Sequence, residues 1–180
     1  LHFKDPLLTR ELTLRDLLSH RTGLPSTDFW AFFQDMPLHE QVARLGAVAP
    51  AAPLRTRHIY QNTMYELVGL VIERVSGQRW DRFLAARLWG PLGMRETVGA
   101  RGQITGGLRH VWPHSYLDGK VEVTDWDLPA DVADAAGSAW TSVHDMSLWA
   151  QFLLRGGVAA DGQRLVSEAS FAEFFEPQSL

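Results

Sequence analysis

The tripeptide Tyr60-Gln61-Asn62 brings together side chains that could carry out acid–base chemistry. It follows a loop that contains Pro and Arg, and it directly precedes the expected start of a helix. A phenol at Tyr60 would lie near backbone N–H groups and the positive end of the helix dipole, which favours the phenolate of a general base. Asn62 offers a donor and an acceptor, so it could hold an amide of a substrate or cap the helix. Spacing alone favours a core tyrosine followed by a helix cap.

The histidines are weaker candidates for chemistry. His110 and His114 flank Trp112, so a strand would place both imidazoles on one face. Pro113 interrupts that strand, and zinc needs three or four ligands, so surface or capping roles are favoured over a metal site. His20 lies at the expected end of a helix, where the dipole favours a structural role. We therefore expect no metal and no other cofactor.

Other possible reactive groups have simpler structural interpretations. A Ser-His-Asp triad could be drawn from Ser19 or Ser138, but the sequence has no Gly-x-Ser-x-Gly elbow, and these serines are placed as caps. The glycine-containing segment 102–107 lacks the lysine and the strand-to-helix context of a phosphate-binding loop. The remaining carboxylates are interpreted as solvated faces: Glu66, Glu73 and the acidic segment 125–134.

Helix signals recur along the sequence. Capping boxes are expected at Thr13 with Asp16 and at Ser142 with Asp145. Gly77 is expected to end one helix, and Gly90-Pro91 the next. Helices are predicted after Thr13, within 38–48, after Asn62, from Trp80, after Ser142 and after Ser167. Two of them carry apolar stripes that predict buried faces, namely Met64, Leu67, Val68, Val71 and Val75, and Met146, Trp149, Ala150 and Leu153.

Only one segment predicts β structure. Asp118-Gly119 is a strong hairpin signal, with strands expected over 114–117 and 120–123. No stretch resembles a complete sheet, a repeat or a flexible linker. The expected fold class is therefore mostly α with a small β hairpin, in one unit that covers residues 1–180.

Composition excludes several functional classes. The chain has 180 residues, 46% of them hydrophobic, and a net charge of −4, which gives no electrostatic basis for binding nucleic acid or an anionic membrane. No apolar run approaches the roughly 20 residues that span a bilayer. There is no Cys, hence no disulfide and no thiolate nucleophile. The opening Leu1-His2-Phe3 resembles the middle of a longer sequence, so signals for a compartment are not readable.

Four segments, taken in order, resemble the serine β-lactamase-related family, which includes class C β-lactamases, DD-peptidases, D-aminopeptidases and esterases. The first is Leu-Arg-Asp-Leu-Leu-Ser-His-Arg-Thr-Gly-Leu-Pro over 14–25. The second is Tyr60-Gln61-Asn62 with the helix up to Gly77, and the third is Pro91-Leu92-Gly93-Met94. The fourth is the Gly-to-Asp-to-Trp helix entry over 136–149. Together they cover nearly the whole chain.

The resemblance implies roles for two of these residues. In that family a Ser-x-x-Lys motif supplies nucleophile and base, Tyr-x-Asn relays a proton and orients the substrate, and a Lys-Thr-Gly-like or His-x-Gly triplet completes the pocket. Tyr60 would then be the catalytic acid/base, and Asn62 would bind the substrate amide. Gln61 stands where the family often has Ser, which leaves the finer substrate class open.

The nucleophile motif does not occur in this sequence. The lysines are Lys4 and Lys120, and the residues three positions before them are Leu1 and Leu117, not Ser. Neither lysine is followed by Thr-Gly. The resemblance therefore implies the helical lobe of the β-lactamase/transpeptidase-like α/β fold, truncated at both ends, with the sheet lobe largely absent. Such a lobe should be inactive alone and should self-associate through uncovered apolar surface.

The expected parent is a serine hydrolase that uses acyl-enzyme chemistry on an ester, β-lactam or D-peptide carbonyl. Its partner would be a small-molecule or peptide-like acyl substrate, without nucleic acid and without a membrane span. The family and the Arg-rich composition favour a bacterial, extracytoplasmic location. The alternative is a non-catalytic module on the same fold that binds a peptide or another ligand.

Overall fold

Side-chain caps begin several of the helices. The computed structural model describes residues 2–29, 36–104, 111–123 and 134–178. The predicted capping box is present at α2 (Leu14–Leu18), where the Thr13 side chain accepts from the Asp16 N–H and the Asp16 carboxylate accepts from the Thr13 N–H. These reciprocal bonds satisfy backbone donors that the start of a helix leaves free. Local sequence therefore determines where α2 begins.

Two short helices lie toward the ends of the described chain. The sequence analysis missed α1 (Pro6–Glu11), although Asp5 and the proline after it are a start signal: the Asp5 side chain accepts from the Leu7 N–H, and Pro occupies the first turn. Near the other end, Ser167 caps α10 (Glu168–Ala172) as predicted.

The capping box predicted at α9 (Val143–Leu154) is only half formed. Ser142 accepts a hydrogen bond from the Asp145 N–H. The buried carboxylate of Asp145 instead accepts hydrogen bonds from the Glu96 N–H and the Thr97 hydroxyl, each at 2.8 Å. Asp145 thus joins the start of α9 to a segment that lies far from it in the sequence.

The buried face of α9 also differs from the predicted stripe. Phe152 is 1% exposed, whereas Met146 is 45% exposed and Ala150 is exposed. Phe152 packs edge-on against Phe171 of α10, with ring centroids 6.5 Å apart. Trp149 of the predicted stripe also packs against the core, so the stripe is confirmed only in part and the buried face is centred on Phe152.

Helix α5 (Thr63–Ser76) is the longest described helix, and it positions the candidate site at its start. Gly77, at φ 71°, ends it as predicted. Leu67 is 2% exposed, but Val71 and Val75 of the predicted stripe are 37% and 82% exposed. The stripe is therefore buried along the first turns of α5, where Met64 and Leu67 belong to the core, and it is exposed along the last turns.

The next helix continues past the point where it was expected to end. It runs as α6 (Trp80–Leu84), widens into a π-helical turn (Ala85–Trp89), and resumes as α7 (Gly90–Leu92). The prediction that Gly90-Pro91 would end it was wrong, because Pro91 lies in the first turn of α7, directly after the π-helical turn, a position that tolerates proline. Gly93, at φ 79°, ends the helix instead.

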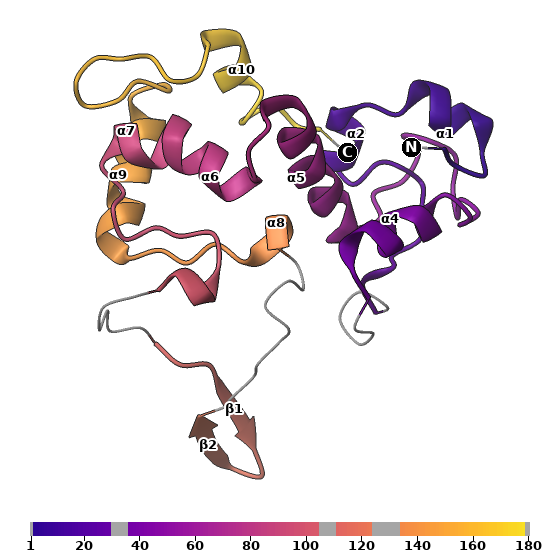
Figure 1. The fold of residues 1–180 in the computed structure, drawn as a ribbon, viewed down its shortest axis with the longest axis horizontal. Helices are drawn as coiled ribbons and strands as arrows, with labels where there is room; N and C mark the ends of the chain where they lie inside the picture. The colour runs from indigo at the N-terminus through magenta and orange to yellow at the C-terminus, as the bar shows by residue number, and fades with distance from the viewer. Residues whose placement is uncertain (1, 30–35, 105–110, 124–133, 179–180) are drawn as a thin grey trace.

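The hairpin is confirmed with its predicted bounds. β1 (His114–Leu117) and β2 (Lys120–Val123) pair antiparallel, with His114 opposite Val123. Asp118 and Gly119 adopt positive φ values of 50° and 78°, as a tight hairpin turn requires. Figure 1 shows the hairpin projecting from the helical body, and most of its side chains are exposed. The fold class expected from the sequence, mostly α with a small hairpin, is confirmed.

Two apolar clusters form the core, and α5 contributes to both. Figure 1 shows α5 between α2 and α4 (Leu38–Leu45) on one side and α6 on the other. Ile72 of α5 packs against the second cluster. The first cluster contains Phe3, Leu8, Leu17, Leu24, Leu45, Met64 and Leu67. The second contains Trp80, Trp89 and Met94.

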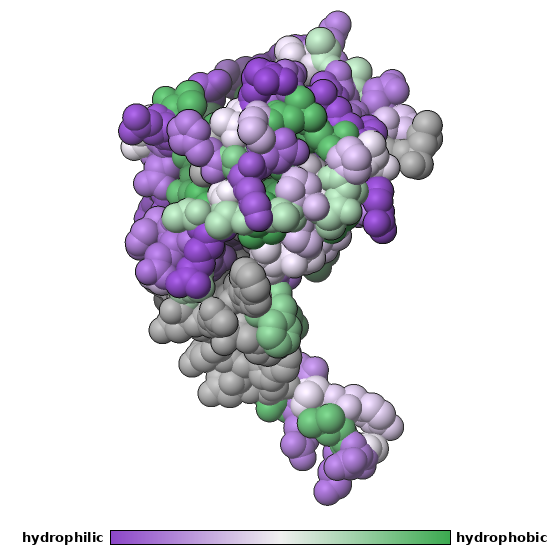
Figure 2. Space-filling model, turned by 90° about the vertical axis from the view of Figure 1, so that its right-hand side faces the viewer, coloured by the Kyte–Doolittle hydropathy of each residue, from purple (hydrophilic) through white to green (hydrophobic). Residues whose placement is uncertain are grey.

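Large apolar side chains remain uncovered on the helical body. Figure 2 shows apolar residues scattered among polar ones on one face. Leu14 and Leu18 of α2 are 48% and 44% exposed, and Phe174 and Phe175 after α10 are 57% and 67% exposed. This agrees with the expectation that apolar stripes of the helical lobe lack cover. Among the described helices, none combines the length and the apolar character needed to cross a membrane.

Candidate active site

The side chains of Tyr60 and Asn62 are hydrogen-bonded to each other. The Tyr60 hydroxyl donates to Asn62 Oδ1 at 3.0 Å, and the Tyr60 side chain is 57% exposed. The alternative interpretation of Tyr60 as a core tyrosine is therefore wrong. An exposed phenol whose hydroxyl is held in one direction can exchange a proton with a bound molecule.

Asn62 does not cap α5 with its side chain, contrary to the capping role considered from the sequence. Its backbone is already helical, at φ −66° and ψ −34°, and its side chain makes no capping hydrogen bond. The Asp28 carboxylate holds it instead. Asp28 Oδ1 accepts from the Asn62 N–H at 2.7 Å, and Asp28 Oδ2 accepts from Asn62 Nδ2 at 2.9 Å. A carboxylate here satisfies a free donor at the helix start and also positions the amide.

His20 lies against the ring of Tyr60. The two ring centroids are 4.7 Å apart, and His20 also contacts the rings of His58 and Tyr65 at 5.5 and 5.3 Å. Burial, together with the nearby His58, lowers the pKa of His20. The structural role expected for His20 is supported, but the helix dipole is not its basis, because the environment favours the neutral imidazole over the charged form.

Gln61 is the buried anchor between the two site residues. It is fully buried, its Nε2 donates to the Leu24 carbonyl at 3.3 Å, and its Oε1 accepts from the Thr27 hydroxyl at 3.4 Å. Thr27 also shares a hydrogen bond with Thr63 at 3.0 Å. These bonds fasten segment 24–28 alongside 61–63. Gln61 therefore has a structural role, because it binds the segment before Asp28 to the start of α5.

An ion pair between the exposed Arg55 and the buried Asp16 holds the loop that leads to Tyr60. Arg55 donates from Nε to Asp16 Oδ1 at 2.8 Å and from an amino group to Asp16 Oδ2 at 2.9 Å. The Arg55 N–H donates to the Arg21 carbonyl, and the Ile59 N–H donates to the His20 carbonyl. Burial opposes the charged form of Asp16, but hydrogen bonds from Arg55 and Thr13 outweigh it and lower its pKa to about 2. The loop that contains Arg55 and Ile59 is thus attached to α2 through Asp16 and to the residues directly after α2 through its backbone.

Glu66 is buried one helical turn beyond Asn62, so its interpretation as a solvated side chain was wrong. It is 5% exposed, and its carboxylate accepts from the N–H groups of Ala135 and Ala136 at 3.2 and 3.3 Å. Burial raises the pKa of Glu66 to about 7, against the opposing effect of these two hydrogen bonds. The neighbouring helix α8 (Asp134–Gly137) packs close to α5. Gly69 permits this approach, because a side chain there would collide with the Ala135 methyl.

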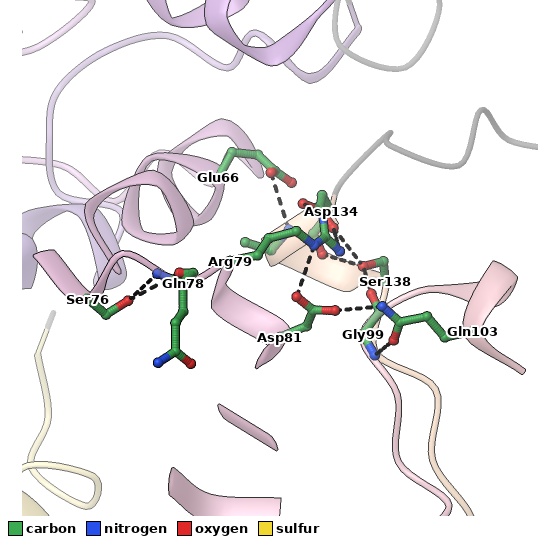
Figure 3. A network of polar contacts seen from close by, with 10 residues as sticks. Glu66, Ser76, Gln78, Arg79, Asp81, Gly99, Gln103, Asp134 and Ser138 are labelled. Carbon is green, nitrogen blue, oxygen red and sulfur yellow. Dashed lines mark hydrogen bonds and ion pairs between the residues drawn. The ribbon is translucent and has the colours of Figure 1, made fainter. Parts of the chain in front are cut away.

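A second ion pair anchors α8 next to Glu66 (Figure 3). Arg79 donates to both carboxylate oxygens of Asp134, at 2.8 and 3.1 Å, and to Asp81 at 2.9 Å. Burial opposes the charge of Asp81, but the hydrogen bonds from Gln103 and Arg79 lower its pKa below the ordinary value. Of the predicted solvated segment 125–134, only Asp134 lies within the described residues, and it forms an ion pair.

The remaining candidates gain no support as reactive groups. Ser19 donates its hydroxyl to the Arg15 carbonyl at 2.6 Å, and Ser138 donates to the Gly99 carbonyl at 2.5 Å. His110 lies outside the described residues, and His114 is exposed on β1. Within the part of the chain that the structure describes, no group of three or more His, Cys, Asp or Glu could hold a metal ion.

Asp28 is the site residue that the sequence analysis missed. It follows the loop that contains Pro25, at a position with helical backbone more than thirty positions before Asn62. No periodicity connects such distant positions, and only the fold brings the carboxylate to the amide. The buried Gln61 contains the one local signal, since a polar side chain in that position needs partners in another segment.

Comparison with known proteins shows the family to which the chain belongs. A family model described as Beta-lactamase matches residues 5–179. Penicillin-binding protein 4 of Amycolatopsis lactamdurans is 30% identical over 175 residues, which cover 93% of this chain and 45% of that protein. An unguisins hydrolase of Aspergillus campestris is 30% identical over 156 residues, or 82% of this chain and 29% of the relative. The chain thus spans less than half the length of these relatives.

Solved structures show the same fold. A penicillin-binding protein from Bacillus halodurans superposes with a TM-score of 0.72 at 23% identity, over 98% of this chain and 58% of that one. A D-amino acid amidase from Ochrobactrum anthropi, complexed with D-phenylalanine, gives a TM-score of 0.67 at 24% identity over 91% and 48% of the two chains. The match spans nearly the whole sequence, and the helices agree with those of the solved structures. The chain therefore belongs to the Beta-lactamase family and forms the helical part of its fold.

Proposed function

We propose that this chain supplies the proton-relaying tyrosine and the substrate-orienting asparagine of a serine hydrolase. The observation that carries the proposal is the hydrogen bond between the exposed Tyr60 hydroxyl and the Asn62 amide, at the start of α5. Family membership supports hydrolysis of an amide, ester or β-lactam carbonyl. The chain would act as a single partial domain, the helical lobe of the larger enzyme.

The reaction would proceed through an acyl-enzyme. A serine hydroxyl from outside this sequence attacks the carbonyl, and its proton passes through a lysine and Tyr60 to the leaving group. Water then attacks the ester, its proton returns to the serine, and the acid is released. Asn62 retains hydrogen-bonding capacity after binding Tyr60 and Asp28, because an amide carries two N–H groups and an oxygen with two lone pairs. We propose that this remaining capacity binds an amide of the substrate.

The names of the relatives narrow the substrates that should be tested first. They include a hydrolase of unguisins, a penicillin-binding protein and an amidase of D-amino acids. We therefore propose a carbonyl in a β-lactam or next to a D-configured residue as the substrate, with simple esters as surrogates. The partner is then a small or peptide-like acyl compound.

The decisive variant is Tyr60→Phe in the protein that contains this chain and a Ser-x-x-Lys motif. Loss of the proton relay should lower kcat/KM for a chromogenic β-lactam or a nitrophenyl ester by about 100-fold or more. Tyr116→Phe is the matched control, because it removes a hydroxyl from the exposed hairpin and should leave activity unchanged. Full activity of the Tyr60→Phe variant would remove Tyr60 from the mechanism.

The isolated 180-residue chain tests whether hydrolysis needs a nucleophile from outside this sequence. It contains no Ser-x-x-Lys motif, so it should not turn over either substrate. Tyr60-dependent hydrolysis by this chain alone would contradict the proposal that the nucleophile comes from elsewhere. If the flanking sequence carried no such motif, the alternative of a non-catalytic binding module would be favoured.

A further inference from the structure

The Asp28 carboxylate contacts Asn62 in two places. One oxygen accepts from the backbone N–H of Asn62 at 2.7 Å, and the other accepts from the side-chain Nδ2 at 2.9 Å. The two bonds hold the backbone and the amide of Asn62 relative to the same rigid group. This arrangement limits rotation of the amide more than either bond alone would.

The chemistry of a carboxylate also decides which way the amide faces. An amide turned by 180° has almost the same shape, so shape alone does not select its orientation. An ionised carboxylate only accepts hydrogen bonds, and therefore the NH₂ group must face Asp28. The amide oxygen must then face Tyr60, which donates its hydroxyl proton to that oxygen at 3.0 Å.

This orientation has a consequence for Tyr60. Because its proton points at Asn62, the lone pairs of the phenolic oxygen point elsewhere and are free to accept a hydrogen bond from another group. With the amide reversed, NH₂ would donate to the Tyr60 oxygen and occupy a lone pair. The Asn62 N–H that does not face Asp28 would also change its direction.

The loop that leads into Asp28 is fixed by hydrogen bonds to the residues around Asn62. Gln61, fully buried, binds the Leu24 carbonyl and the Thr27 hydroxyl, and Thr27 is also bonded to Thr63. The residue before Asp28 is therefore fixed to the residues that flank Asn62. A carboxylate on such a support can position its partner within the narrow tolerance that catalysis requires.

We propose that Asp28 is a positioning residue for the candidate reaction, because it fixes the Asn62 amide in the orientation that makes Tyr60 a donor toward Asn62. The inference rests on the proposed function of Tyr60 and Asn62. It assigns to Asp28 no contact with the reacting atoms. Its effect passes entirely through Asn62.

The first test is Asp28→Asn in the protein that contains this chain and the nucleophile motif. Asparagine keeps the size of the side chain but can face Asn62 with a donor or an acceptor, so the orientation is no longer selected. We expect kcat for a nitrophenyl ester or a chromogenic β-lactam to fall about 10- to 100-fold, with a smaller change in KM. Glu73→Gln, which removes an equal charge from an exposed part of α5, should leave kcat unchanged.

A double-mutant cycle tests whether Asp28 acts through Asn62. In an Asn62→Ala background, Asp28→Asn should have no further effect on kcat, whereas independent residues would give additive losses. Asp28→Glu, which retains the carboxylate, should regain part of the activity. An additive loss, or a fall in melting temperature with kcat unchanged in Asp28→Asn, would overturn the proposal. If Asp28→Asn does not fold, the same cycle with Asp28→Glu as the single variant decides the question.

The outcomes also separate this proposal from the one on which it rests. If Tyr60→Phe is inactive and Asp28→Asn is fully active, only the positioning role fails. If both variants are fully active, the role of Tyr60 fails and Asp28 has nothing to position.

Discussion

Two buried carboxylates in this chain have opposite electrostatic settings. Asp16 and Glu66 are 4% and 5% exposed, each lies in a helix, and each accepts hydrogen bonds from the backbone. The pKa of Asp16 is lowered to about 2, whereas that of Glu66 is raised to about 7. Burial raises both pKa values, and more strongly that of Glu66, while the hydrogen-bonding partners add to the difference.

Asp16 has an arginine of its own as a hydrogen-bonding partner, whereas Glu66 has none. The Asp16 carboxylate accepts hydrogen bonds from two nitrogens of Arg55 and from the hydroxyl of Thr13. Together these bonds outweigh the effect of burial on its pKa. Glu66 receives only two backbone N–H bonds at 3.2 and 3.3 Å, and the Arg79 beside it is engaged by Asp134 and Asp81. Backbone donors alone therefore do not keep a buried carboxylate charged at neutral pH here, whereas a dedicated arginine does.

The largest effect is expected from Asp16→Ala. This change removes half of the capping box of α2 and the charge-assisted hydrogen bonds that the buried carboxylate accepts, so the free energy of unfolding should fall by about 3 kcal/mol. Urea unfolding at pH 7 measures it. A loss below about 1 kcal/mol would mean that the pair is an ordinary surface interaction.

A smaller, pH-dependent effect is expected from Glu66→Gln. Because folding raises the pKa of Glu66 from 4.5 to about 7, the folded state binds more protons between these values, and stability falls as pH rises through that window. The contribution, fully present below pH 4.5, is on the order of 2–3 kcal/mol. Unfolding curves at pH 4.5 and 7.5 should differ less for the glutamine variant than for the parent. An unchanged difference would place the pH dependence elsewhere.

The smallest effect is expected from Arg55→Met, which gives Asp16 a setting closer to that of Glu66. Since Arg55 is exposed and its charge stays solvated after the change, the loss of stability at pH 7 should be smaller than for Asp16→Ala. The pKa of Asp16 should rise, so acid unfolding should begin at a higher pH than in the parent. An unchanged acid midpoint would show that the bonds from Thr13 suffice, and that the cation is not the cause of the contrast.

Local signals predicted much of the fold. The box between Thr13 and Asp16, the stop at Gly77 and the turn at Asp118-Gly119 each depend on residues close in sequence, and each is present. The helix end predicted at Gly90-Pro91 was wrong, because the sequence does not distinguish a proline after a helix from a proline in the first turn of one.

Long-range contacts could not be predicted in the same way. The exposure of Tyr60, the burial of Glu66 and the contact of Asp28 with Asn62 depend on how separate segments pack. The resemblance to a known family singled out Tyr60 and Asn62, whereas their supporting residues required coordinates. A polar side chain on a helix has no sequence mark that separates a solvated glutamate from a buried one.

The projecting hairpin offers a place for spectroscopic labelling. Glu122 is exposed on β2, and the chain contains no Cys, so Glu122→Cys would introduce a single thiol. A fluorophore attached there would report tumbling and association of the helical body while touching neither Tyr60 nor Asn62. Fluorescence anisotropy against concentration would then follow whether copies of the chain gather through the uncovered leucines and phenylalanines.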